Sequence, residues 1–259
     1  MRKNPIKAKL KRGEPVVGIL NNIQHPFVIE VLALAGIEFV ILDGEHTTLS
    51  PELAEHLYRA AELRGITAIT RIGENTQQVI QKFMDAGSMG VFMPLINNRE
   101  DAERVVASVK YPPVGRRGLA GSRAADFGMG MPLDEYVKMA NEETMITLQI
   151  ETREAIANYK EIIAVEHVDA VFFGPNDISS NLGMPGHARD PEVVSLIERL
   201  GKEVIAAGKV AATIARDVED YKRWREKGFL WFSTGPSHLM ARGTQEFLGE
   251  IADYEKGHG

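Results

Sequence analysis

The sequence predicts a single-domain (β/α)8 barrel, the TIM barrel. Eight short apolar runs alternate with helical stretches, the runs show no apolar-polar alternation, and no Pro/Ser-rich or charge-block linker divides the 259 residues. Runs of this kind are typical of strands buried on both faces, and strands separated by helices pair in parallel. A doubly wound open sheet is the alternative, but no Gly-rich dinucleotide fingerprint follows the first run. We therefore expect one barrel over residues 1–259.

The predicted strands recur along the whole chain. They lie near residues 15–20, 37–42, 66–71, 89–94, 144–150, 168–174, 209–214 and 229–234. Five of the runs follow a glycine that can close the preceding helix in the left-handed conformation. These five glycines are Gly36, Gly65, Gly87, Gly208 and Gly228.

The second run ends in a charged sequence, FVILDGEH, at residues 39–46. Asp43-Gly44 alone is also a hairpin signal. A helical pattern follows instead of a second alternating strand, with Ser50 placed as its N-cap and Pro51 at its first position. The charged residues therefore lie on a strand-to-helix loop.

The longest interruption of the pattern is KYPPVGRRGLAGSRAADFGMGM, at residues 110–131. Its Gly and Pro content predicts a structured loop, and long loops on this fold tend to lie over the site. We therefore expect this segment to cover the C-terminal face of the barrel.

Composition excludes several classes of function. The formal net charge is −6 and no Lys/Arg stripe occurs, which argues against a nucleic-acid partner. No apolar run approaches a membrane span, and the N-terminal sequence lacks the apolar core of an export signal. The sequence has no cysteine, which removes thiol nucleophiles and disulfides and fits the cytoplasm.

Polar side chains follow several of the predicted strands, and the C-terminal strand ends of a barrel meet on one face. They are Asp43, Glu45, His46, Arg71, Gln149, Glu151 and Asp177. Glu151 and Asp177 belong to neighbouring strand ends, where two carboxylates suit Mg²⁺ or Mn²⁺ completed by water and substrate oxygens. The alternative for each carboxylate is a local cap or ion pair.

Arg71 places a permanent cation at the same rim. Beside a metal ion this cation implies an anionic ligand between them, although a structural ion pair is the alternative. His46 is the histidine on a strand-end loop beside acids, where it can act as a base near neutral pH. No lysine lies inside a predicted strand, since Lys209 opens the seventh run at the opposite end, so imine chemistry is not expected.

Six motifs together resemble the class II pyruvate aldolases of the hydroxy-keto-acid (HpcH/HpaI) aldolase family, which includes 4-hydroxy-2-oxoheptanedioate aldolase. The motifs are LDGEH, ITRIGEN, FMDAG, YPPVGRRG, QIETREA and GPNDIS, and the resemblance extends over about residues 5–250. It implies a metal-dependent carbon-carbon lyase that cleaves or forms 4-hydroxy-2-oxo acids, giving pyruvate and an aldehyde. Mg²⁺ or Mn²⁺ is the implied metal, with Co²⁺ as a further candidate.

The resemblance also implies roles for individual residues. Glu151 and Asp177 would bind the metal, and Gln149 with the backbone around Asn176 and Asp177 would hold the pyruvyl part. His46 would be the base and Arg71 would stabilise the transition state.

The family pattern gives Asp85 the role of raising the basicity of the histidine. Its place in the sequence puts Asp85 near a helix C-terminus at the bottom of the barrel, so either a neighbouring chain brings it close or the helix ends elsewhere. By sequence position alone, Asp43 would take that role. The family forms homo-oligomers, commonly hexamers, and the apolar tail helix at about 236–254 is expected in their contacts.

Two alternatives stay open. One is a lyase acting on an acyl-CoA ester of the citramalyl-CoA type, for which GRRGLAGSR is the candidate basic groove. The other is a non-catalytic barrel that binds a small keto acid.

Overall fold

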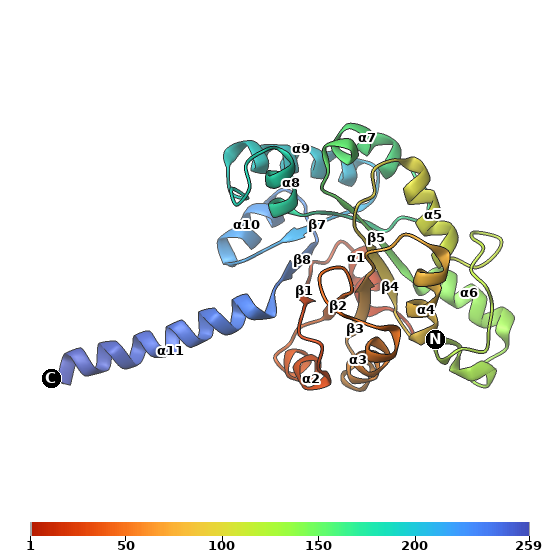
Figure 1. Cartoon of the computed structure of the whole chain (residues 1–259), viewed down its shortest axis with the longest axis horizontal. Helices are drawn as coiled ribbons and strands as arrows, with labels where there is room; N and C mark the ends of the chain where they lie inside the picture. The colour runs from red at the N-terminus through yellow and green to blue at the C-terminus, as the bar shows by residue number, and fades with distance from the viewer. Residues whose placement is uncertain (1, 259) are drawn as a thin grey trace.

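The computed structural model describes residues 2–258 and confirms the (β/α)8 barrel. Eight parallel strands close in chain order, with β8 paired to β1 (Figure 1). Every strand agrees with its predicted run to within two residues at each end. The strands are β1 (Val16–Asn21), β2 (Phe39–Asp43), β3 (Thr67–Arg71), β4 (Gly90–Met93), β5 (Met145–Ile150), β6 (Ala170–Phe173), β7 (Val210–Ile214) and β8 (Trp231–Thr234).

Helices follow the strands and surround most of the barrel (Figure 1). They are α1 (Pro5–Lys11), α2 (Pro26–Leu34), α3 (Pro51–Arg64), α4 (Gln77–Ala86), α5 (Arg99–Val109), the 3-10 helix η1 (Arg123–Gly128), α6 (Leu133–Glu143), α7 (Arg153–Ile163), α8 (Pro175–Asn181), α9 (Pro191–Ala206), α10 (Val218–Glu226) and α11 (Pro236–His258). The five predicted glycines all have positive φ. The start of α3 is also as predicted, because the Ser50 hydroxyl accepts the Leu53 N–H (3.1 Å).

Two apolar cores hold the barrel together. One lies inside it, where Ile6 and Leu10 of α1 pack with Phe39 and Trp231 and close the N-terminal end of the barrel. The Phe39 and Trp231 rings meet edge to face at 4.8 Å. The other core lies between the strands and the surrounding helices. Burial on both faces explains why the strands lack alternation.

Residues 110–131 lie at the N-terminal end of the barrel, so the expectation that they cover the C-terminal face is wrong. Arg123 Nη1 donates to the Ala86 carbonyl (2.9 Å), and Lys110 Nζ donates to the Thr144 carbonyl (2.8 Å). Ala86 and Thr144 precede β4 and β5, at the ends where those strands begin. The segment is displaced because it joins two helices, α5 and α6, and does not follow a strand.

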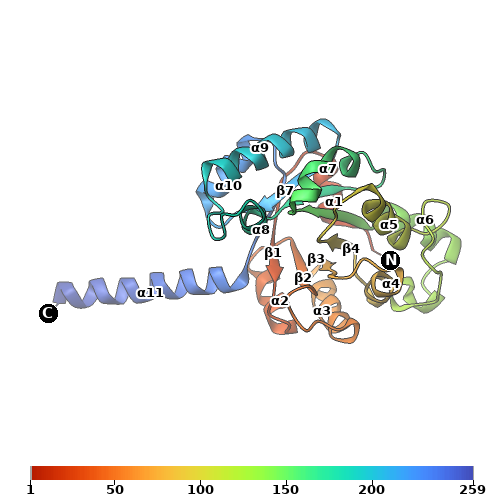
Figure 2. The same cartoon turned by 45° about the horizontal axis from the view of Figure 1, so that its top comes forward.

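The last helix, α11, leaves the barrel and projects away from it (Figure 1), and Figure 2 shows the same projection from a second direction. It begins at the predicted residue and ends four residues later than predicted, at His258. Val17 of β1 is 39% exposed. Among residues 2–258, no helix combines the length and apolar character that crossing a membrane requires.

Candidate active site

The site begins with an ion pair that the strand register creates. Asp43 ends β2, Arg71 ends β3, and the two residues are direct partners in the parallel ladder. Arg71 Nε donates to Asp43 Oδ1 (2.9 Å) and Nη2 donates to Oδ2 (2.7 Å). Both side chains are buried, so this two-bond contact fixes the guanidinium at the barrel rim.

Asp43 also orders the loop that follows it. Its Oδ1 accepts the backbone N–H groups of Glu45 (3.1 Å) and His46 (3.2 Å). Burial raises the pKa of Asp43, but the hydrogen bonds and charge of Arg71, with these N–H groups, outweigh it and lower the pKa overall. The expectation that Asp43 orients the His46 imidazole does not match these contacts, because the carboxylate bonds the histidine through its backbone.

Glu45 is the carboxylate beside the imidazole. Its Oε2 lies 3.4 Å from His46 Nε2 and 3.1 Å from Arg71 Nη1. Burial raises the pKa of Glu45, Arg71 and His46 oppose the rise, and Asp43 and Asp177 add to it. The sequence places Glu45 among the strand-end acids but predicts no role for it. The His46 side chain is 65% exposed at the mouth of the barrel.

Glu151 follows β5 directly and is buried. Its Oε1 accepts the Leu95 N–H (2.8 Å), and its Oε2 accepts from Gln149 Nε2. Leu95 adopts φ +55°, which a leucine rarely does, so the loop after β4 is held in the conformation that makes this bond. Burial, together with the charges of Asp177 and Glu45 and opposed by the Leu95 N–H, raises the pKa of Glu151 to about 7.

Asp177 and Gln149 meet over Gly174, which directly follows β6. A Cβ atom placed on Gly174 would lie 2.9 Å from Asp177 Oδ2 and 3.1 Å from Gln149 Nε2. Gln149 also bonds Glu151, so the three side chains form one group across β5 and β6. The Gln149 Oε1 atom is buried and has no hydrogen-bond partner among residues 2–258.

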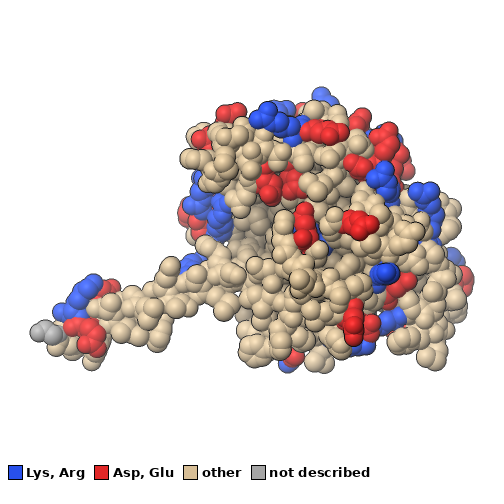
Figure 3. Space-filling model, in the orientation of Figure 1, with Lys and Arg blue, Asp and Glu red and all other residues tan. Residues whose placement is uncertain are grey.

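The donor set of this group fits a hard divalent cation. Glu151 and Asp177 provide carboxylate oxygens, and the exposed position of Asp177 leaves room for water or substrate oxygens. Asp43, Glu45, Glu151 and Asp177 together carry more negative charge than Arg71 balances. Figure 3 shows a hollow near the centre of the molecule with acidic side chains on part of its rim. No group of three or more metal-binding side chains occurs within residues 2–258, so a cation here needs further ligands from solvent or substrate.

A cavity of about 390 Å³ opens at this end of the barrel. It joins the expected catalytic residues to side chains that follow β6, β7 and β8. It is lined by Leu20, Asn22, Asp43, His46, Arg71, Asn176, Ile214, Arg216, Thr234, Gly235 and His238. Arg216 and His238 were not predicted from the sequence. The signal for Arg216 was available, since it is a charged residue just after the seventh apolar run.

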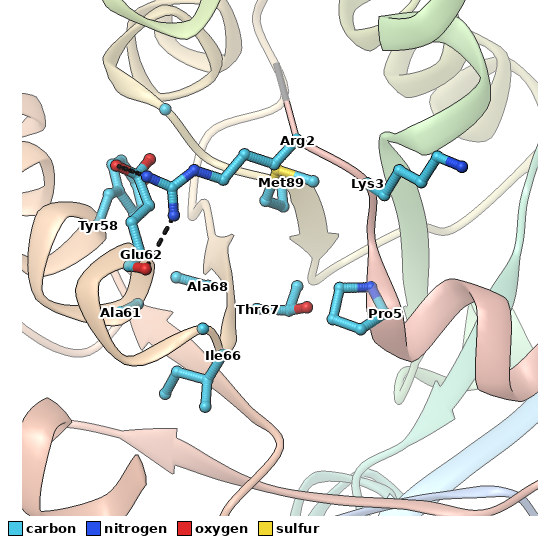
Figure 4. Close-up of a pocket in the computed structure, with 12 residues that line it drawn as sticks. Arg2, Lys3, Pro5, Tyr58, Ala61, Glu62, Ile66, Thr67, Ala68 and Met89 are labelled. Carbon is cyan, nitrogen blue, oxygen red and sulfur yellow. Dashed lines mark hydrogen bonds and ion pairs between the residues drawn. The ribbon is translucent and has the colours of Figure 1, made fainter.

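Asp85 does not join this group within one subunit. It lies in the last turn of α4, where its Oδ1 accepts from Arg117 Nη2 (2.6 Å). The N-terminal end of the barrel, where Asp85 lies, also contains a separate cavity of about 60 Å³ (Figure 4). Arg2 reaches across that cavity and donates to the Glu62 carbonyl (2.8 Å). None of the expected catalytic residues lines it.

Comparisons with known proteins agree with this geometry. The family model described as HpcH/HpaI aldolase/citrate lyase matches residues 18–241. The 4-hydroxy-2-oxo-heptane-1,7-dioate aldolase of Salmonella typhimurium is 32% identical over 98% of this chain and 97% of its own length. An HpcH/HpaI aldolase structure from Desulfitobacterium hafniense is 31% identical over 95% of both chains, with a TM-score of 0.88. The citrate synthase SbnG structure is 32% identical over 98% of both chains, with a TM-score of 0.86.

Proposed function

Because the chain belongs to the HpcH/HpaI aldolase/citrate lyase family, we propose that it is a metal-dependent aldolase. In this reaction a 4-hydroxy-2-oxo acid is cleaved to pyruvate and an aldehyde, or is formed from them in the reverse direction. The observation that carries the proposal is the grouping of Gln149, Glu151 and Asp177 around Gly174 at the barrel mouth. Arg71 and His46 line the cavity at the same mouth.

Glu151 and Asp177 would hold the divalent ion, with Mg²⁺ or Mn²⁺ as the expected metals and Co²⁺ as a further candidate. When bound, such an ion supplies Lewis-acid polarisation of the 2-oxo group. Gln149 and the backbone at Asn176 and Asp177 would hold the pyruvyl part. The unpartnered Gln149 Oε1 supports a ligand contact at this point.

Arg71 is prepared to stabilise negative charge. A guanidinium has five N–H groups; two of those of Arg71 donate to Asp43, and its Nη1 lies 3.1 Å from Glu45 Oε2 without a hydrogen bond. The remaining N–H groups can donate to the oxygen on which charge develops. Because Asp43 holds the group rigidly, little reorganisation is needed during the reaction.

His46 would be the base. In the cleavage direction its imidazole takes the proton of the 4-hydroxyl, the C3–C4 bond breaks, and its electron pair moves into the pyruvate enolate as the aldehyde forms. The same imidazolium returns the proton to C3, which balances the reaction as pyruvate. Glu45, 3.4 Å away, stabilises the charged imidazole between these steps.

The test is pyruvate release from 4-hydroxy-2-oxo acids with Mn²⁺ present, followed by exhaustive chelation. We expect chelation to abolish turnover and added metal to restore it. His46→Ala should retain metal binding, measured by calorimetry, while kcat falls roughly 100-fold or more. Undiminished activity after chelation refutes the metal role, and a wild-type kcat for His46→Ala refutes the base.

Within one subunit Asp85 lies in the last turn of α4, which ends at Ala86, and at the opposite end of the barrel from His46. We therefore propose that a neighbouring copy brings Asp85 to the histidine. Mixing inactive His46→Ala and Asp85→Asn subunits under conditions of subunit exchange should then regenerate active sites. Mixtures no more active than the separate variants count against a shared site.

The projecting helix α11 supports a homo-oligomer, for which a hexamer is the expected form. Its apolar residues share one face and are exposed; they are Met240, Phe247, Leu248, Ile251 and Tyr254. Phe27, Val31 and Leu34 of α2 are also exposed, as is Val17 of β1. We propose that α11 of a second copy covers this surface. A chain that ends before Pro236 should lose assembly by light scattering, whereas Leu63→Ser on α3 should not.

The acyl-CoA alternative has less support. Arg117 and Arg123 of the candidate basic groove pair with Asp85 (2.6 Å) and Glu62 (2.5 Å) at the opposite end of the barrel from His46. The likeness to a citrate synthase keeps a coenzyme A binding measurement worthwhile. A non-catalytic keto-acid binder would bind pyruvate tightly without turning over any aldol. The absence of cysteine continues to favour the cytoplasm.

A further inference from the structure

The loop between β4 and α5 adopts a strained conformation beside Glu151. Its second residue, Leu95, has φ +55°, which a leucine adopts only where its surroundings enforce it. The Leu95 N–H donates to Glu151 Oε1 (2.8 Å), so the strained residue contacts an expected metal ligand. The Leu95 side chain is exposed and cannot anchor the loop, although the next side chain, Ile96, is fully buried. Contacts further along the loop therefore help to hold the Leu95 N–H in place.

Asn97 fastens this loop to two helices. Its Oδ1 accepts from the Thr152 hydroxyl, and its carbonyl accepts from Asn158 Nδ2 (3.0 Å) on α7. Its backbone N–H donates to Asp101 Oδ2 (3.1 Å) on α5. Asn97 is therefore held from both sides, and Leu95 lies only two residues before it.

Thr152 directly follows Glu151, and its hydroxyl has two partners. Its Oγ1 accepts the Ala155 N–H (3.0 Å) as the N-cap of α7, which leaves the hydroxyl hydrogen to be donated to Asn97 Oδ1. The chain around Glu151 and the loop after β4 are thus joined twice, once through the Leu95 N–H and once through the Thr152 hydroxyl. Because the Leu95 N–H holds one carboxylate oxygen of Glu151, the direction of the other oxygen depends on this loop.

We propose that Asn97 is a positioning residue, which acts through the Leu95 N–H to hold the Glu151 carboxylate in the direction that binds a divalent cation. The inference rests on the proposed metal-dependent function, because it concerns an expected metal ligand. Removing a hydrogen-bond partner of a metal-binding side chain typically weakens metal affinity about 10- to 100-fold. Because Asn97 acts through the loop and does not touch the carboxylate, we expect the lower end of this range, roughly tenfold.

The experiment measures Mn²⁺ affinity by calorimetry. Asn97→Ala and Thr152→Val each break the side-chain bond between the loop and the start of α7, and each should weaken binding roughly tenfold. Thr152→Ser retains the hydroxyl and should bind Mn²⁺ like the wild type. If the two residues act through one bond, the double variant Asn97→Ala/Thr152→Val should bind no more weakly than either single variant. Ser50→Ala is the control for lost helix stability, because it removes the hydroxyl N-cap of α3 as Thr152→Val removes that of α7.

A second measurement needs no metal. Hydrogen exchange of the Leu95 amide in the metal-free protein reports whether its N–H stays bonded to Glu151. Asn97→Ala should speed this exchange by up to about tenfold, and Ser50→Ala should leave it unchanged. Unchanged Leu95 exchange in Asn97→Ala overturns the positioning role even if the Mn²⁺ affinity falls.

The outcomes separate this inference from the proposed function. Wild-type Mn²⁺ affinity in Asn97→Ala and Thr152→Val overturns the role of Asn97 and leaves the metal-dependent aldolase intact. An equal loss in Thr152→Ser or in Ser50→Ala assigns the effect to general destabilisation and also overturns it, as do additive losses in the double variant. If the wild type itself binds no Mn²⁺, the metal-dependent function fails and the inference fails with it.

Discussion

Asp43→Asn should destabilise the protein and impair catalysis through the same contact. The substitution removes the negative charge beside a guanidinium whose side chain is only 7% exposed. Breaking a buried ion pair costs about 3–5 kcal/mol. Because Glu45 still contacts Arg71 at 3.1 Å, we expect the lower end, about 3 kcal/mol in the free energy of unfolding.

In a chain of this length that loss lowers Tm by roughly 6–12 °C. Arg71 and the His46 loop also lose their common anchor, and a misplacement near 1 Å reduces kcat roughly 100-fold. The assays are thermal unfolding and pyruvate release. Glu103→Gln breaks the exposed pair with Arg99 (2.6 Å) and should change stability by less than about 1 kcal/mol.

The pH dependence has a definite sign. The folded protein lowers the pKa of Asp43 below its usual 3.8. The folded state then binds fewer protons than the unfolded state just below pH 3.8, so this stabilisation is present above that pH and is lost as pH falls through the folded pKa. The difference in the free energy of unfolding between the wild type and Asp43→Asn should therefore become smaller in acid.

A double-mutant cycle with Arg71→Met tests the mechanism. If the unpaired guanidinium causes the loss, the double variant should be more stable than the sum of the two single effects predicts, by about 0.5–3 kcal/mol. Strict additivity, or a stability of Asp43→Asn equal to the wild type, refutes the buried-pair reasoning.

Two further predictions concern the expected metal group. Gly174→Ala places a methyl 2.9 Å from Asp177 Oδ2 and should weaken Mn²⁺ binding about tenfold by calorimetry. The control is Gly235→Ala, which adds a methyl with no atom within 4 Å and should leave the Mn²⁺ affinity unchanged. Equal effects of the two substitutions would contradict the steric explanation. Since the pKa of Glu151 is raised to about 7, protons compete with the metal below that pH, so Mn²⁺ affinity should fall by up to about tenfold per pH unit from pH 7 downward. A flat affinity from pH 6 to 8.5 would contradict the assignment of Glu151.

The barrel was predictable because its strands are buried on both faces, which marks each strand in the sequence. The convergence of Arg71, Glu151 and Asp177 followed from the same topology, since parallel strands deliver their C-terminal ends to one face. The role of Asp43 did not follow. The register of the β2–β3 pair places the Asp43 carboxylate beside Arg71. Asp43 and Glu45 are both within three residues of His46 in the sequence, so the sequence alone does not show that Glu45 is the acid that faces the imidazole.

Two other differences have equally local causes. Residues 110–131 occupy the N-terminal end because they follow α5, and a long insertion covers the site only when it follows a strand. Arg216 lies two residues after β7, where it donates to Asn176 Oδ1 (3.0 Å) and forms no ion pair within the described residues. Whether Arg216 has a charged partner depends on the residues that surround it in space, and the sequence does not show which residues these are.

The departure of α11 from its own barrel has a consequence for folding. A subunit alone leaves Val17 and the exposed apolar residues of α2 in water, so a partner that covers them would add to the stability of the fold. If copies exchange this helix as proposed, the melting temperature should rise with protein concentration and recovery from denaturant should include a second-order phase. Dilution would then act on this enzyme as a mild denaturant.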